Sequence, residues 1–141
     1  MKVFVPKTQK LFVVAAMAMA CIGIIELPRM SRATDQPGDA ERGKTLFEKR
    51  CTGCHSLDQD KEGPRLRSVY GRKAGTVASF EYSDALKNAH IVWGDATLDK
   101  WLTDTDALIP SNDMAFHVPK PEERTDIIAF LRSAAQAAQK Q

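Results

Sequence analysis

The sequence of 141 residues carries almost no excess charge. The formal charge at pH 7 is +2, but five basic side chains and only one acidic side chain fall in the first 33 residues. From Thr34 onward, 15 lysines and arginines stand against 17 aspartates and glutamates, which gives a charge near −2. Nucleic-acid-binding proteins carry a basic patch or stripe that complements phosphate. The missing basic excess therefore argues against nucleic acid as a partner.

Long apolar runs are also lacking. The longest one, from Leu11 to Ile25, has 15 residues and follows three lysines, whereas a helix that spans a bilayer needs about 20. A basic start, a short apolar run and the small residues Ser31 and Ala33 are typical of a secretory signal. The sequence therefore predicts a cleaved signal peptide over residues 1–33 and one domain over residues 34–141. The alternative is that residues 1–33 stay in place as a membrane anchor.

Cysteine and histidine are scarce, with three of each. Cys21 lies within the apolar run and is interpreted as part of the discarded segment. Cys51 and Cys54 are three residues apart, and His55 follows directly, which is the attachment pattern of c-type haem. Each thiol adds to one vinyl group of the porphyrin, and the histidine then falls under the iron as an axial ligand. The sequence therefore predicts one covalent haem c.

Two other interpretations of the cysteine pair are weaker. A zinc site needs further ligands, and beyond His55 the domain offers only His90 and His117, with no second pair of cysteines. A redox dithiol is expected within a thioredoxin-like βαβ pattern, which the sequence does not show. Haem attachment is therefore favoured over both.

The small number of methionines predicts the second axial ligand of the iron. Met114 is the only methionine after residue 33, and it lies in a polar loop, where a methionine that merely fills the core is not expected. A thioether favours Fe(II), and Met/His ligation raises the reduction potential. His117, three residues further on, is the alternative ligand.

Periodicity predicts a small helical domain with long loops. The stretch 56–81 has no periodicity, and an irregular segment of this length is unusual unless it covers a ligand. We find no strand pairing and no internal repeats. Residues 104–119 are predicted to be a loop. The predicted helices are Asp39–Arg50, Asp84–Asn88 capped by Ser83, Ala96 to about Thr103 capped by Asp95, and a last helix that opens at Pro121.

These features together resemble a known family. Residues 38 to about 133 resemble the class I cytochromes c, in particular mitochondrial cytochrome c and bacterial cytochrome c2. The resemblance covers the whole predicted domain in order. Besides the haem motif, the matching residues are Gly38–Lys44 with Phe47, Gly63-Pro64, Gly71–Gly75, Phe80–Ala85, Trp93, Leu98, Leu102, Pro110, Met114–Phe116, Glu123-Arg124 and Phe130-Leu131.

The resemblance implies the all-α cytochrome c fold, in which small helices and long loops wrap around one covalently bound haem. It implies that the first and last helices cross, with Gly43 and Phe47 against Ile127 and Phe130. It also implies roles for four residues around the haem. Pro64 would orient His55 through its carbonyl, and Tyr82 and Trp93 would hydrogen-bond a buried propionate, with Arg72 nearby. Without the resemblance, Tyr82 and Trp93 would be interpreted as ordinary core aromatics.

The sequence departs from the family pattern at four positions. Ser111 stands where the family usually has glycine, and Asp113 where a lysine commonly precedes the methionine. Trp101 occupies the place of a tyrosine near the methionine sulfur, and Leu86 replaces a polar residue near the haem interior. These departures bear on the reduction potential and the docking surface.

The function implied is that of a monomeric, periplasmic electron carrier. Two protein ligands on the iron leave no open site for a substrate, so we expect no enzyme activity. We expect redox proteins as partners: membrane complexes, oxidases or dehydrogenases. Thioether formation takes place on the export side of a membrane, in agreement with the predicted signal. The alternatives are a tethered carrier that faces the periplasm, and a haem enzyme or gas sensor with a labile methionine ligand.

Overall fold

The computed structural model describes Met1 and residues 37–140. The predicted signal segment, including Cys21, lies outside the described residues apart from Met1, so its cleavage stays a prediction. Among residues 37–140, no helix is both long and apolar enough to cross a bilayer.

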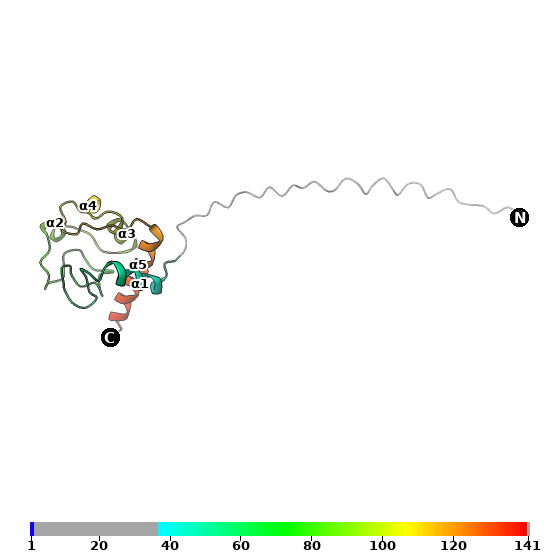
Figure 1. The fold of residues 1–141 in the computed structure, drawn as a ribbon, viewed down its shortest axis with the longest axis horizontal. Helices are drawn as coiled ribbons and strands as arrows, with labels where there is room; N and C mark the ends of the chain where they lie inside the picture. Colours follow the sequence, from blue (N-terminus) through cyan, green and yellow to red (C-terminus); the bar gives the residue numbers. More distant parts are fainter. Residues whose placement is uncertain (2–36, 141) are drawn as a thin grey trace. The chain divides into compact units, whose positions relative to one another are not determined.

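The described domain is helical, as predicted, and contains five helices. Long loops join them (Figure 1). No strand occurs among residues 37–140. The helices are α1 (Ala40–Arg50), α2 (Asp84–Lys87), α3 (Asp95–Thr103), α4 (Thr105–Leu108) and α5 (Pro121–Ala138).

Helix α1 begins and ends close to where its periodicity predicts. Asp39 is the N-cap, and its carboxylate accepts hydrogen bonds from the N–H groups of Glu41 and Arg42 at 2.9 and 3.1 Å. Such a cap satisfies backbone donors that have no partner within the helix. The helix ends at Arg50 and Cys51 is its C-cap. It therefore leads the chain directly into the cysteine pair.

Helices α1 and α5 pack against one another (Figure 1). Gly43 of α1 faces the backbone of α5 at Asp126. One turn later the rings of Phe47 and Phe130 pack with their centroids 5.2 Å apart. The first and last helices thus cross where the resemblance implies.

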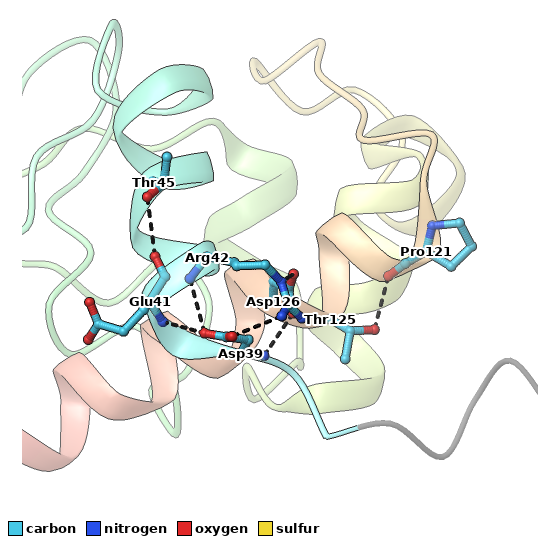
Figure 2. Close-up of polar contacts among 7 residues, drawn as sticks. All are labelled: Asp39, Glu41, Arg42, Thr45, Pro121, Thr125 and Asp126. Atoms are coloured by element: carbon cyan, nitrogen blue, oxygen red, sulfur yellow. Dashed lines mark hydrogen bonds and ion pairs between the residues drawn. The ribbon is translucent and has the colours of Figure 1, made fainter.

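A polar cluster joins the N-terminal end of α1 to α5 (Figure 2). The carboxylate of Asp126 accepts the Asp39 N–H at 2.7 Å, and Arg42 Nε and Nη2 at 2.8 and 2.9 Å. The guanidinium of Arg42 also donates to the Asp39 carboxylate at 2.8 Å. Asp126 is only 6% exposed, so its charge depends on these partners.

The prediction that Asp95 caps α3 is wrong. Gly94 is the N-cap, and its N–H donates to Thr97 Oγ1 at 2.7 Å. Asp95 is the first residue of the helix, and its carboxylate instead accepts the Tyr70 hydroxyl at 3.1 Å and pairs with Arg132 of α5. Aspartate is a common N-cap, but here the N-cap is a glycine without a side chain, and its own N–H is bonded by Thr97.

The predicted loop over residues 104–119 contains a short helix, α4. Asp104 is its N-cap and accepts the Ala107 N–H at 3.0 Å. One helical turn is too short to show a periodicity of 3.6 residues, so no pattern marks it. The loop ends at Val118, which is fully buried and donates its N–H to the Leu102 carbonyl at 2.6 Å.

The structure also contains a short backbone pairing that the sequence does not predict. Lys73 and Val92 form an isolated antiparallel bridge. On one side of it the Trp93 N–H donates to the Arg72 carbonyl at 2.9 Å, and the Gly71 N–H donates to Trp93 at 2.7 Å. A pairing of this length leaves no alternating pattern in the sequence. It brings Arg72 and Trp93 together.

Candidate functional site

The helices and loops enclose a cavity of about 570 Å³, a size typical of ligand sites. It lies between the turn after α1, the long irregular segment, α3, the loop after α4 and α5. All eight residues predicted to attach, ligate or contact the haem line this one cavity: Cys51, Cys54, His55, Pro64, Arg72, Tyr82, Trp93 and Met114.

The two cysteines lie on a turn that continues from α1. The His55 N–H donates to the Cys51 carbonyl at 2.8 Å, so the backbone makes a helix-like turn from the first cysteine to the histidine. Both thiols are free; Cys51 is half-buried and Cys54 is exposed. Burial raises the pKa of the Cys51 thiol to about 11, against a smaller lowering by Arg50. The turn therefore presents two thiols and an imidazole to the same cavity.

His55 is buried and its ring is fixed. Its Nδ1 lies 2.8 Å from the carbonyl oxygen of Pro64. Because a carbonyl only accepts, Nδ1 carries the proton and the lone pair is left on Nε2. Burial lowers the pKa of His55, the bond to Pro64 opposes this, and Lys61 adds to the lowering. The imidazole is therefore neutral at pH 7 and suited to bind a metal through Nε2.

Gly63 makes room for this ring. A Cβ at position 63 would lie 2.2 Å from Cε1 and 2.7 Å from Nε2 of His55. Any side chain there would displace the imidazole. The Gly63 N–H also donates to the Cys54 carbonyl at 2.9 Å, which holds the irregular segment against the cysteine turn.

Met114 reaches the cavity from the loop after α4. It is half-buried and lines the cavity together with the buried Trp101. The two remaining histidines, His90 and His117, are exposed and do not line the cavity. Of the two candidate second ligands, the structure therefore brings Met114 into one cavity with His55, and leaves His117 outside it.

Arg72, Tyr82 and Trp93 form a polar section of the cavity wall. Tyr82 and Trp93 are 8% and 6% exposed. Arg72 Nε is buried and has no hydrogen-bond partner among the described residues, while Nη2 donates to the Arg65 carbonyl at 3.2 Å. Burial lowers the pKa of Arg72, with nearby Tyr82 as the main opposing influence. A half-buried cation whose Nε is buried and has no partner is suited to an anionic group of a ligand.

Three further residues contribute that the sequence did not single out. Phe80 packs edge-on against Tyr82, with ring centroids 4.9 Å apart, and also lines the cavity. Asn112 and Thr105 hydrogen-bond the backbone of Met114. Phe80 is among the residues that carry the resemblance, whereas Asn112 and Thr105 belong to no motif and no periodic pattern. The only signal in the sequence is the position of Asn112 two residues before Met114.

The alternative of a zinc site finds no support. Within residues 37–140, no three side chains of the histidine, cysteine, aspartate and glutamate types gather closely enough to hold a metal ion.

Comparison with known proteins identifies the domain. Residues 40–135 match the family model for cytochrome c. The chain belongs to the cytochrome c family. It is 46% identical over 99 residues to a cytochrome c of Euglena viridis, a match that covers 68% of this chain and 97% of the relative. It is 41% identical over 110 residues to a cytochrome c of Chlamydomonas reinhardtii, covering 74% and 98% of the two chains.

A solved structure agrees with the fold. Cytochrome cH from Methylobacterium extorquens superposes with a TM-score of 0.65 at 37% sequence identity, over 68% of this chain and 99% of that one. The predicted cytochrome c fold is therefore confirmed.

Cytochromes c bind one covalent haem c and transfer electrons through it, so the predicted cofactor and the coarse function are confirmed. The cavity fits the group on three counts. A neutral imidazole presents a free Nε2, a thioether lines the same cavity, and the buried Nε of Arg72 is an unused donor for an anionic propionate. Haem, when bound, supplies an iron that changes oxidation state by one electron.

Proposed function

We propose that this cytochrome c is a periplasmic, monomeric electron carrier whose haem iron is held by His55 and Met114. The observation that carries the proposal is that both side chains line one cavity, with the His55 ring fixed so that Nε2 is free. Imidazole and thioether together are the ligand pair of electron-transfer cytochromes. A carrier needs both axial positions filled by the protein, because an open position would admit other ligands.

Cys51 and Cys54 are proposed to carry the two thioether bonds. They lie on one turn, with His55 bonded to the Cys51 carbonyl at its end. This geometry lets a single turn of backbone attach the ring and place the imidazole under its iron. Pro64 keeps the imidazole in the tautomer that binds metal, through the 2.8 Å contact with Nδ1.

Arg72, Tyr82 and Trp93 are proposed to hold a propionate. The unused Arg72 Nε supports this assignment, because a buried donor without a partner costs about 1–3 kcal/mol unless a ligand satisfies it. Charge neutralisation by Arg72 would keep the propionate ionised in a largely apolar surrounding. This is also why we favour ligand contacts over purely structural roles for the two aromatic residues.

Absorption spectra of the purified protein test the ligation. We expect the oxidised protein to show the sulfur-to-iron charge-transfer band, and Met114→Ala to abolish it and to lower the reduction potential. His117→Ala is the matched control, since His117 is exposed and outside the cavity, and should leave both unchanged. A band that survives in Met114→Ala, or that appears only when His117 is altered, would show that the ligand is misassigned. A vacant or exchangeable sixth position in the native protein would instead favour a haem enzyme or gas sensor.

The compartment is tested separately. We propose a periplasmic protein that begins near Thr34, with redox proteins such as membrane complexes, oxidases or dehydrogenases as partners. Intact-mass measurement of the native protein after cell fractionation decides this point. A chain that keeps residues 1–33 and is recovered with membranes would mean a tethered carrier.

A further inference from the structure

Two side chains, rather than regular secondary structure, hold the backbone of Met114. Its N–H donates to Asn112 Oδ1 at 2.7 Å. Its carbonyl accepts the Thr105 hydroxyl at 2.5 Å and the Phe116 N–H at 3.0 Å. Residues 112–120 form neither helix nor strand. These contacts therefore decide where the loop presents the Met114 side chain.

Asn112 forms hydrogen bonds both to residues before it in the chain and to Met114 after it. While Oδ1 accepts from Met114, Nδ2 donates to the Ile109 carbonyl at 2.9 Å and to the Asp106 carboxylate at 3.1 Å. One amide thus connects the end of α4 to the residue that lines the cavity. With both Nδ2 donors used, the amide has a single orientation that satisfies all three partners.

The segment enclosed by Asn112 contains a strained residue. Ser111 has φ +64° and is the only residue other than glycine with positive φ among residues 37–140. This conformation costs an L-residue roughly 1–2 kcal/mol. Strain of this kind persists only where surrounding contacts over-determine it. The bonds from Asn112 to Ile109 and Met114 close the chain on either side of Ser111 and supply such contacts.

Thr105 fixes the other side of Met114. It is 2% exposed and is the first residue of α4, which Asp104 caps. Its hydroxyl therefore reaches the Met114 carbonyl from the protein interior. The methionine backbone is held from two sides, by an amide along the loop and by a hydroxyl beneath it.

We propose that Asn112 is a positioning residue for Met114. Its amide, together with the Thr105 hydroxyl, holds the loop so that the Met114 thioether stays in the cavity and resists replacement by other ligands. The inference rests on the proposed ligation of the iron by Met114. Asn112 acts through the methionine backbone and is not itself proposed as a ligand.

Competition by exogenous imidazole measures this effect, because imidazole binds haem iron. The oxidised holoprotein is titrated with imidazole at fixed pH, and loss of the sulfur-to-iron charge-transfer band is followed. Asn112→Ala removes three hydrogen bonds and should tighten the apparent affinity for imidazole by about tenfold. It should also weaken the band before imidazole is added.

Thr97→Ala is the matched control. Like Asn112, Thr97 accepts one backbone N–H and donates to a backbone carbonyl, at Gly94 and Val92, but it does not line the cavity. A general loss of stability would affect both variants equally. We expect the imidazole affinity of Thr97→Ala to stay at that of the wild type. Equal shifts in the two variants would overturn the proposal.

A rescue variant isolates the bond to Met114. The double variant Asp106→Asn, Asn112→Asp keeps an acceptor at position 112 for the Met114 N–H. The amide at position 106 then donates to the carboxylate at position 112. Its imidazole affinity should be weaker than that of Asn112→Ala, since the bonds to Met114 and to position 106 are kept, although a carboxylate oxygen then faces the Ile109 carbonyl in place of a donor. An affinity as high as that of Asn112→Ala would contradict the assigned bond.

Two further measurements test the proposal even if Asn112→Ala does not fold. Thr105→Val keeps the shape of the side chain and removes only the hydroxyl, and it should also tighten imidazole binding. In the wild type, hydrogen exchange of the Met114 amide should be slow because Asn112 accepts its proton. Exchange at the rate of a free peptide would overturn the proposal. If the wild type shows no charge-transfer band, the proposed ligation itself is wrong; if the band is present and insensitive to Asn112, only this inference fails.

Discussion

Gly43 in α1 lies against the carbonyl group of Asp126 in α5. A Cβ at position 43 would come within 1.9 Å of the Asp126 oxygen and 2.9 Å of the Phe130 Cβ. The first of these neighbours is backbone and cannot turn aside as a flexible side chain would. The close approach of the two helices therefore depends on the absence of a side chain at position 43.

We predict that Gly43→Ala lowers the free energy of unfolding by at least about 2 kcal/mol, even though alanine favours a helix by about 1 kcal/mol. Guanidinium denaturation of the holoprotein measures the change. Gly94→Ala is the control, since a Cβ there meets nothing within 4 Å, and it should cost about 1 kcal/mol at most. If the Gly43 variant were as stable as the wild type, α1 and α5 could move apart to accommodate a side chain without loss of stability, which would contradict the argument.

The same crossing predicts a dependence of stability on pH. Burial favours the neutral form of Asp126, but bonds from Arg42 and the Asp39 N–H outweigh it and hold the pKa of Asp126 below its usual range. A carboxyl whose pKa is lowered in the folded state stabilises the protein above its unfolded pKa, and this contribution is lost as pH falls through the folded value.

We therefore expect Asp126→Asn to be less stable than the wild type by about 2 kcal/mol at pH 7, because it replaces charged hydrogen bonds by neutral ones. The difference should shrink as the pH falls below about 4. Denaturation curves at pH 7, 5 and 3 test this. A constant difference over that range would show that the charge of Asp126 does not matter.

Ser111 offers a stabilising substitution. Its φ of +64° lies in the left-handed region, which glycine adopts without strain. Ser111→Gly should raise the free energy of unfolding by about 1 kcal/mol, because relief of strain outweighs the greater flexibility of the unfolded chain. Ser133→Gly, at an exposed position of α5, should do the opposite by about 0.5–1 kcal/mol. Thermal unfolding distinguishes the two, and a loss of stability in both would contradict the argument.

Haem attachment is expected to organise the fold. A domain that encloses a cavity of about 570 Å³ loses packing along its walls when the cavity is empty. We predict that the double variant Cys51→Ser, Cys54→Ser loses all covalently bound haem and does not become compact, as measured by acid extraction of haem and by circular dichroism. Cys21→Ser, outside the motif, should keep bound haem. A compact apoprotein would contradict the prediction.

Docking is predicted to depend weakly on salt. The exposed charged residues of the cavity wall are Glu62, Glu81, Asp113 and Arg50, and Arg50 pairs with Glu123 at 2.6 Å. This rim lacks a strong positive field, in keeping with the charge near −2 after residue 33. Strong steering changes association rates by about tenfold or more. We expect the electron-transfer rate with an acidic partner to fall by less than about tenfold as salt rises, and a steeper fall would rule the hypothesis out.

Local patterns in the sequence determined the parts of this protein that a few neighbouring residues specify. The spacing of Cys51, Cys54 and His55 predicts the haem because the chemistry needs one turn of backbone. The first and last helices follow from apolar spacing, and the last also from the proline at its first position, Pro121. Met114 was found because it is the only methionine after residue 33, and the structure places it in the cavity.

Tertiary structure alone decided the contacts between distant segments. The bond between Asp39 and Asp126 joins residues 87 positions apart, and no window of sequence shows it. The unused donor of Arg72, the bridge beside Trp93 and the amide of Asn112 that holds Met114 have no local signature either. Each of these features depends on where segments that are separated by a long loop meet. The packing of the whole domain around the cavity determines where they meet, because local backbone preferences do not specify it.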